Sequence, residues 1–172
     1  MAPQLTFGKP IDFSADVPVF PPGATAFAAL AGVFLWKATG VRLQFLPTPL
    51  AGMFFRLSVV AAIAAVSFGV LSTAGKTLQD AGSGTLFLPV NGLATAFPYD
   101  TSRNPMYAGL VFACMPGAAI AFNTGWVFPM MVPLFLYLHL VVISAEEALL
   151  TKEFGEAYAA LCSEVPRWGL FL

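Results

Sequence analysis

The sequence predicts an all-α membrane protein with about four transmembrane helices and a C-terminal amphipathic helix. Of the 172 residues, 58% are hydrophobic and only 10% are charged, whereas about 25% of the residues of a typical soluble domain are charged. The mean hydropathy is +0.80. Because so few charged side chains cannot cover a surface that faces water, we expect an integral, multi-pass membrane protein. The length fits one domain, residues 1–172.

Four apolar stretches approach or exceed the roughly 20 residues that a helix needs to cross a bilayer. The first runs from about Gly23 to Gly40 and the second from about Leu50 to Ala74. The stretch from Pro105 to Ser144 contains no Asp, Glu, Lys or Arg and is long enough for two crossings. Asn123-Thr124-Gly125 divides it as a tight turn.

The segments around these spans are expected to lie at the membrane surface. Residues 1–22 have no basic region leading into an apolar run, so they are expected to form an interfacial arm and not a secretory signal. The loop Leu86–Val90 is apolar and is expected at the interface or over a cavity. Residues 145–162 are expected to continue the last span as an amphipathic helix. The distribution of Lys and Arg puts both termini and the long loop in the cytosol.

Composition also argues against some classes of partner. The net charge of −1 provides no basic field, so a nucleic-acid partner is not expected. The two cysteines, Cys114 and Cys162, lack the spacing of a metal site, and no metal is expected.

A polar segment precedes the third span. Asn104 and Pro105 have the residue types of a helix N-cap and first helical position. A helix N-terminus beside Arg103 also suits an anionic group. Tyr99 and Tyr107 add aromatic faces that suit a purine or a cation. The segment therefore has a structural and a ligand-binding interpretation.

A pair of carboxylates, Glu146 and Glu147, follows the fourth span. On a helical projection they flank the apolar stripe, and carboxylates at the membrane edge are costly without a ligand or partner. A solvated helix end is the alternative. His139, the only histidine, falls on the same face, where a hydrogen bond to a neighbouring helix is the alternative to catalysis. Arg56 is expected to snorkel or pair, although it is also able to bind an anion.

The order of several motifs resembles a known family. They are Gly84-Thr85, Pro89, Leu93-Ala94-Thr95, Pro98-Tyr99, Arg103-Asn104-Pro105-Met106-Tyr107-Ala108-Gly109, Glu146-Glu147-x-x-Leu150, Phe154-Gly155-x-x-Tyr158 and Val165-Pro166-Arg167-Trp168. In this order they resemble the integral-membrane methyltransferases, which comprise the isoprenylcysteine carboxyl methyltransferases and the related phospholipid methyltransferases. The resemblance covers about half of the chain, residues 84–168.

The resemblance implies S-adenosylmethionine as the methyl donor and S-adenosylhomocysteine as the product. The donor-binding core is expected at residues 84–168, at the cytosolic edge of the last helices, with the C-terminal segment as a cap. Arg103 and Glu147 are the candidate catalytic residues: Arg103 suits the donor carboxylate, and Glu147, or alternatively His139, is a candidate base. The implied donor contacts are Asn91, Gly92, Leu93, Ala94, Tyr99, Asn104, Pro105, Met106, Tyr107 and Glu146.

One departure bears on the acceptor. The prenylcysteine enzymes carry an arginine for the substrate carboxylate one turn before the Glu pair, where this chain has Val142. An anionic acceptor group would lack a charge partner there. We therefore expect a lipidic or amphipathic acceptor with a neutral or amine group. Membrane lipid is a second expected partner.

Two other functions remain open from sequence alone. A membrane reductase of the sterol-reductase type would bind NADPH, but the chain has no obvious cluster of basic residues for the 2′-phosphate. A non-catalytic membrane scaffold would not require polar residues on inward faces. The sequence favours a methyltransferase over both.

Overall fold

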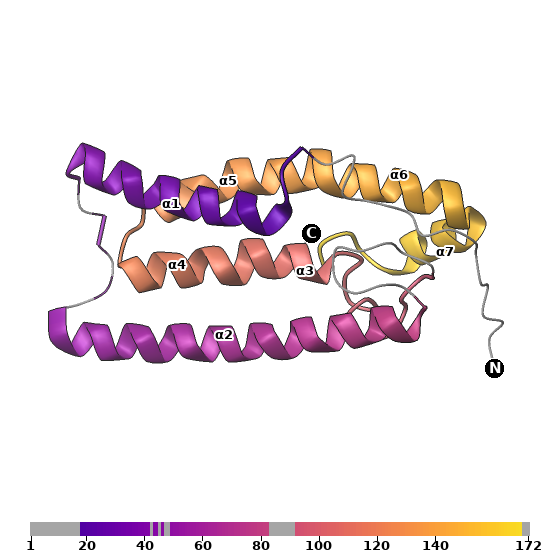
Figure 1. Cartoon of the computed structure of the whole chain (residues 1–172), viewed down its shortest axis with the longest axis horizontal. Helices are drawn as coiled ribbons and strands as arrows, with labels where there is room; N and C mark the ends of the chain where they lie inside the picture. Colours follow the sequence, from indigo (N-terminus) through magenta and orange to yellow (C-terminus); the bar gives the residue numbers. More distant parts are fainter. Residues whose placement is uncertain (1–17, 42, 45, 47–48, 83–91, 170–172) are drawn as a thin grey trace. The chain divides into compact units, whose positions relative to one another are not determined.

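The structure, a computed structural model, describes residues 18–41, 43–44, 46, 49–82 and 92–169 (Figure 1). All regular elements in these ranges are helical, which confirms the predicted all-α class. They are α1 (Pro21–Thr39), α2 (Pro49–Asp80), α3 (Pro105–Gly109), the π-helical turn η2 (Leu110–Cys114), α4 (Met115–Phe122), α5 (Val127–Tyr137), the π-helical turn η3 (Leu138–Val142), α6 (Ile143–Phe154) and α7 (Glu156–Glu164). The arm of residues 1–17, the apolar loop Leu86–Val90 and Asn91 lie outside the described ranges.

Three helical stretches in the described ranges are long and apolar enough to cross a membrane. The first, Gly52–Asp80, lies in α2; Pro105–Phe122 comprises α3, η2 and α4; and Val127–Phe154 comprises α5, η3 and α6. They correspond to the second, third and fourth predicted spans. Helix α1 corresponds to the first predicted span and is not among the three.

The ends of α1 follow from local sequence. Pro21 and Pro22 occupy its first turn, where a missing backbone N–H costs nothing. These two residues were expected in the N-terminal arm and belong to the helix instead. At the other end Gly40 adopts a left-handed conformation with φ of 66°, and its N–H donates to the carbonyl of Trp36. The predicted boundary at Gly40 is therefore confirmed.

Helix α1 packs closely against α5 (Figure 1). The contact is at Gly32, where a Cβ atom would lie 2.8 Å from Cα of Val127. The Tyr137 hydroxyl accepts a hydrogen bond from the N–H of Val19 at 3.0 Å and donates one to the carbonyl of Val19 at 2.7 Å. A small residue and a tyrosine thus fix α1 along α5.

The predicted turn between the third and fourth spans is present. Asn123 has a positive φ of 48° and ends α4. Its side-chain amide exchanges hydrogen bonds with the backbone of Leu46, and the N–H of Gly125 donates to the carbonyl of Leu43 at 2.8 Å. The same turn therefore also anchors part of the connection between α1 and α2.

The predicted continuous helix over residues 145–162 is wrong. Helix α6 ends at Phe154, and α7 begins at Glu156 after a break at Gly155. Gly155 has φ of 48° and ψ of −118°, which is outside the conformations open to residues with a side chain. The glycine therefore separates the last membrane helix from a short terminal helix.

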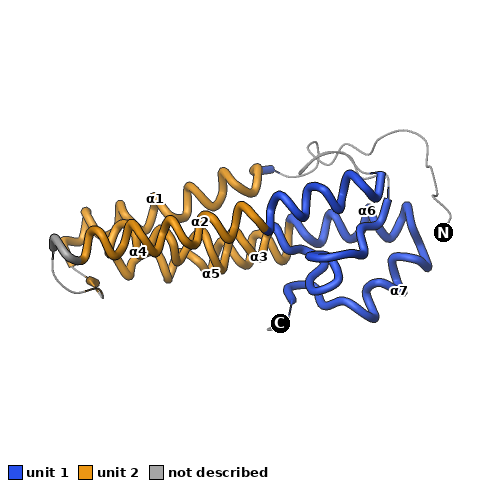
Figure 2. Tube along the Cα trace, turned by 90° about the horizontal axis from the view of Figure 1, so that it is seen from below, with its two compact units in different colours: residues 1–18, 70–106, 142–172 blue, residues 19–69, 107–141 orange. Residues whose placement is uncertain are grey.

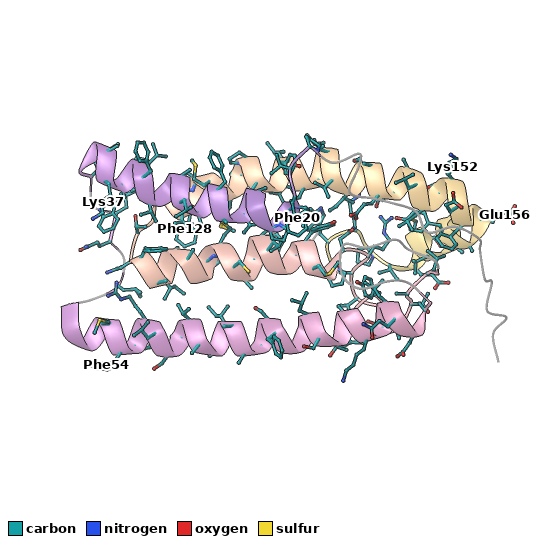
Figure 3. The ribbon with its side chains drawn as sticks, in the orientation of Figure 1. Phe20, Lys37, Phe54, Phe128, Lys152 and Glu156 are labelled. Atoms are coloured by element: carbon teal, nitrogen blue, oxygen red, sulfur yellow. The ribbon has the colours of Figure 1, made fainter. Side chains whose placement is uncertain are left out.

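The chain divides into two compact units (Figure 2). Unit 1 comprises Met1–Pro18, Val70–Met106 and Val142–Leu172, and unit 2 comprises Val19–Gly69 and Tyr107–Val141. Many large apolar side chains are exposed, including those of Phe54 and Phe128, whereas Lys152 and Glu156 are exposed charged residues of unit 1 (Figure 3). Exposed aromatic side chains along apolar helices are suited to contact with lipid.

Candidate functional site

A compact turn precedes α3 and positions most of the predicted polar residues. The N–H groups of Thr101 and Ser102 both donate to the carbonyl of Pro98, at 3.2 and 3.3 Å. The Thr77 hydroxyl, near the end of α2, donates to the carbonyl of Phe97 at 2.8 Å. Hydrogen bonds therefore stabilise the turn internally and also connect it to α2 within unit 1.

Tyr99 projects from this turn into an apolar cluster. It is 8% exposed and packs with Ala74 and Ala94, and partly buried Leu78 and Met106 adjoin them. Its hydroxyl oxygen is buried and has no hydrogen-bond partner. A buried polar group without a partner costs roughly 1–3 kcal/mol. In native proteins such a group calls for an explanation, and a bound ligand is one.

The negative charge of Glu146 acts on the phenol of Tyr99. Burial and, to a smaller extent, the Glu146 carboxylate raise the pKa of the Tyr99 phenol above its usual value. The phenol therefore keeps its proton in the physiological range and is a hydrogen-bond donor. A protonated phenol is able to donate a hydrogen bond, and a carboxylate to accept one.

Arg103 lies at the centre of a second polar group. Its Nη1 lies 2.8 Å from Oε1 of Glu147 and donates to the hydroxyl of Tyr158 at 3.3 Å and to Sγ of Cys162 at 2.7 Å. The side chains of Arg103 and Glu147 are 14% and 16% exposed. Burial first, and then the Glu147 charge, raise the pKa of Tyr158.

A second guanidinium also binds Glu147. Nε of Arg167 donates to Oε1 of Glu147 at 3.0 Å, and Nη2 donates to Oε2. The Glu147 carboxylate is therefore bound through both oxygens by Arg167 and through one by Arg103. We call Arg103, Glu147 and Arg167 the ion network.

The C-terminal segment Val165–Gly169 is bonded to the turn before α3. The N–H of Arg103 donates to the carbonyl of Pro166 at 3.0 Å. The carbonyl of Arg167 accepts from the Ser102 hydroxyl at 3.3 Å and from the Asn104 side-chain amide at 3.0 Å. Val165 and Trp168 are each 6% exposed, so this segment is packed as well as hydrogen-bonded.

The structure brings several predicted site residues together within unit 1. Arg103 and Glu147 form an ion pair, and Tyr99 and Glu146 interact electrostatically. Asn104 immediately precedes α3 as predicted, but its amide binds the carbonyl of Arg167.

The remaining described donor contacts flank the turn in the sequence. Ala94 and Met106 adjoin Tyr99, and Pro105 begins α3. Gly92 lies close to the backbone of Ala81, since a Cβ on the glycine would collide with the Ala81 carbonyl. Leu93 is partly buried, and Tyr107, 3% exposed, belongs to unit 2.

Sequence reasoning did not assign site roles to Arg167, Tyr158 and Cys162. Arg167 and Tyr158 stand in the motifs that carry the family resemblance, and Arg167 is one of only eight basic residues in the chain. The signal available in the sequence was that Arg167 is a charged residue in a largely apolar chain.

Two other candidates have local partners in unit 2. The His139 ring stacks on Phe135 with centroids 5.6 Å apart. Arg56 donates from Nε to the carbonyl of Gly52, one turn earlier in its own helix, at 3.2 Å. Among the residues that the structure describes, no cluster of three or more His, Cys, Asp or Glu side chains is arranged for a metal.

Comparison with family models decides the relationship. The model of the phospholipid methyltransferases matches residues 48–157, more than half of the chain. The chain belongs to the phospholipid methyltransferase family. The match confirms the resemblance seen in the sequence, and it includes Tyr99, Arg103, Glu146 and Glu147.

No significant match is found among curated proteins or solved structures. Membership in the phospholipid methyltransferase family, together with three apolar helices, implies a membrane methyltransferase with a lipid acceptor. The match gives no support to a membrane reductase.

Proposed function

We propose that this protein transfers a methyl group from S-adenosylmethionine to an amine or neutral group of a lipidic acceptor. The observation that carries the proposal is the buried Tyr99 hydroxyl, which lacks a partner and lies within the electrostatic reach of Glu146. This pair occurs in a chain of the phospholipid methyltransferase family.

The polar groups of unit 1 fit the proposed donor. S-adenosylmethionine has hydroxyl and ammonium groups that need an acceptor, and Glu146 provides one. The protonated Tyr99 phenol provides a donor to an oxygen or nitrogen of the same ligand. The proposed contacts with the rest of the donor come from residues 91–94 and from Asn104 to Tyr107, within a donor-binding core of residues 84–168 of one domain.

The chain's own residues contribute binding and orientation to catalysis. Bound S-adenosylmethionine supplies an electrophilic methyl group, whose bonding electron pair stays with the sulfur. Fixing the acceptor and the donor in line is the main contribution open to the protein. An amine acceptor also releases a proton, for which Glu147 in unit 1 and His139 are the two candidate bases in the sequence. Arg103 is proposed to act beside Glu147, with which it is paired.

The charges of unit 1 favour an acceptor that is not an anion. Val142, at the position where prenylcysteine enzymes carry an arginine, is fully buried and apolar. Arg103 and Arg167 both bind the Glu147 carboxylate, which offsets one of their two positive charges and engages both guanidinium groups. A carboxylate acceptor would therefore have to compete with Glu147 for a cation, whereas an amine would not.

We further propose that α1 is a fourth membrane span and that the site faces the cytosol. Nineteen residues at about 1.5 Å each give about 28 Å, close to the roughly 30 Å of a bilayer core. Exposed Phe27 and Phe34 on α1 are suited to lipid, and Lys37 lies over the Trp36 ring near its end. The excess of Lys and Arg near the site supports the cytosolic side.

Calorimetry of the purified protein tests the proposal. Titration with S-adenosylhomocysteine is expected to give saturable binding, and titration with NADPH none. Binding of NADPH without binding of S-adenosylhomocysteine would contradict a methyltransferase and favour the reductase. Absence of binding by both would contradict the donor site.

A further inference from the structure

The ion network links three separate segments of unit 1. Arg103 lies in the turn before α3, Glu147 on α6, and Arg167 in the C-terminal segment. Through Arg103 the network also reaches Tyr158 and Cys162 on α7. A single carboxylate is therefore the common partner of two segments that are far apart in the sequence.

The surroundings of Glu147 suit it poorly to proton transfer. Both of its oxygens accept hydrogen bonds from guanidinium groups, and the side chain is 16% exposed. Each carboxylate oxygen already accepts from a guanidinium N–H, so proton transfer to Glu147 would have to compete with these contacts. Glu146, the adjacent residue, is the one whose charge reaches the unpartnered Tyr99 hydroxyl.

The segment fixed by Glu147 lies against predicted donor contacts. The carbonyl of Arg167 accepts from Asn104, and the carbonyl of Pro166 accepts from the N–H of Arg103. Gly169, with φ of 93°, brings the chain close to Ser102, whose Cβ would lie 3.5 Å from a Cβ on the glycine. A displacement of Arg167 therefore alters the backbone that precedes α3.

We propose that Glu147 is a positioning residue, which acts through Arg103 and Arg167 to fix the C-terminal segment Val165–Gly169 on the turn before α3. The inference rests on the proposed donor site, because the geometry that it fixes is that of Asn104 and its neighbours. The two glutamates thus have separate roles: Glu146 contacts the ligand, and Glu147 orders the segments around it.

Cys162 supplies a readout that does not depend on the donor. Its Sγ contacts Nη1 of Arg103, and the residue is half-buried. Cys114, the other cysteine, is exposed on η2 in unit 2 and is replaced by alanine as the background for every variant. The rate of Cys162 labelling by N-ethylmaleimide then reports whether the ion network is intact.

The test compares Glu147→Gln, Arg167→Gln and the double variant with the control Glu153→Gln, an exposed glutamate of the same helix. We expect Glu147→Gln to label at least tenfold faster at Cys162 and to bind S-adenosylhomocysteine at least tenfold more weakly. Arg167→Gln is expected to act in the same direction, and the double variant to add little to Glu147→Gln. The control is expected to match the parent protein in both measurements.

Other outcomes separate this inference from the proposed function. If Glu147→Gln keeps the parent labelling rate and affinity but loses turnover with a shifted pH profile, Glu147 is the base and the positioning role is wrong. If the parent protein does not bind S-adenosylhomocysteine, the proposed function fails, while the labelling rates still test the network. If Glu147→Gln does not fold, Arg167→Lys takes its place in the test, since lysine keeps the charge but loses the bidentate contact with Glu147. Parent-like labelling in Arg167→Lys would contradict the inference.

Discussion

Neighbouring residues of the same type have different surroundings in this protein. Glu147 is bound by two arginines, whereas the charge of Glu146 reaches a buried phenol that has no hydrogen-bond partner. The sequence predicted both glutamates as site residues from their place beside the apolar stripe. It could not separate their environments, because Arg103 and Arg167 are 44 and 20 residues away from Glu147 in the chain.

Glu146 is expected to matter for the ligand more than for the fold. Glu146→Ala should weaken binding of S-adenosylhomocysteine by more than tenfold, or about 1.4 kcal/mol, because the ligand loses its acceptor. Calorimetry measures the affinity, and Glu153→Ala on the exposed face of α6 is the matched control. Equal affinities of the folded Glu146→Ala protein and the control would remove Glu146 from the site.

Tyr99→Phe is expected to separate stability from binding. The substitution keeps the ring in its apolar cluster and removes a buried hydroxyl that has no partner. Because such a hydroxyl costs roughly 1–3 kcal/mol, the ligand-free variant should melt at the parent temperature or above. Its affinity for S-adenosylhomocysteine should fall about three- to tenfold, as one hydrogen bond is lost. A lower melting temperature with unchanged affinity would indicate a structural role for the hydroxyl.

Alkaline pH tests the environment of the same phenol. Burial and Glu146 raise the pKa of Tyr99, so the unfolded chain loses this proton before the folded protein does. The stability associated with the neutral phenol is therefore fully present below about pH 10 and is lost as the pH rises above it. The free energy of unfolding should fall more steeply with pH in the parent protein than in Tyr99→Phe. Parallel curves of unfolding free energy for the two proteins above pH 10 would contradict a raised pKa of Tyr99.

Helix boundaries were predictable where single residues determine them. Pro105, Gly40 and Asn123 mark ends that the structure confirms, because each restricts the backbone in a known way. Helix α2 instead runs to Asp80, beyond the predicted end at Ala74, since hydropathy estimates membrane thickness and not helix length. The break at Gly155 was missed because a glycine in an amphipathic pattern does not by itself reveal a positive φ.

The close packing of α1 on α5 gives a prediction for Gly32. A Cβ there would lie 2.8 Å from Cα of Val127 and 2.9 Å from the carbonyl oxygen of Trp126, which are backbone atoms. Gly32→Ala should therefore destabilise the protein by about 1–3 kcal/mol, despite the better helix propensity of alanine. Gly69→Ala in α2 is the control, since nothing lies within 4 Å of its added Cβ. Thermal unfolding compares the two, and equal stabilisation by both would contradict the contact.

At the scale of the molecule, composition was the most informative part of the sequence. The hydrophobic fraction predicted the membrane helices, and the order of motifs predicted the family that the comparison shows. The site residues that were missed lie on α7 and in the C-terminal segment that follows it, beyond the matched residues 48–157. Their roles depend on folding of that segment onto the turn before α3, and no local pattern specifies such a contact.

The proposed reaction is methyl transfer to a lipidic acceptor without an anionic reacting group. The most direct measurement uses the purified protein in lipid bilayers with methyl-labelled S-adenosylmethionine. Label is counted in an aminophospholipid, a total membrane lipid extract and a farnesylcysteine analogue, with Glu146→Ala as the binding-deficient control. Label is expected in the aminophospholipid or the lipid extract, and it should be lost in Glu146→Ala. Label in the farnesylcysteine analogue alone, or in none of the three, would contradict it.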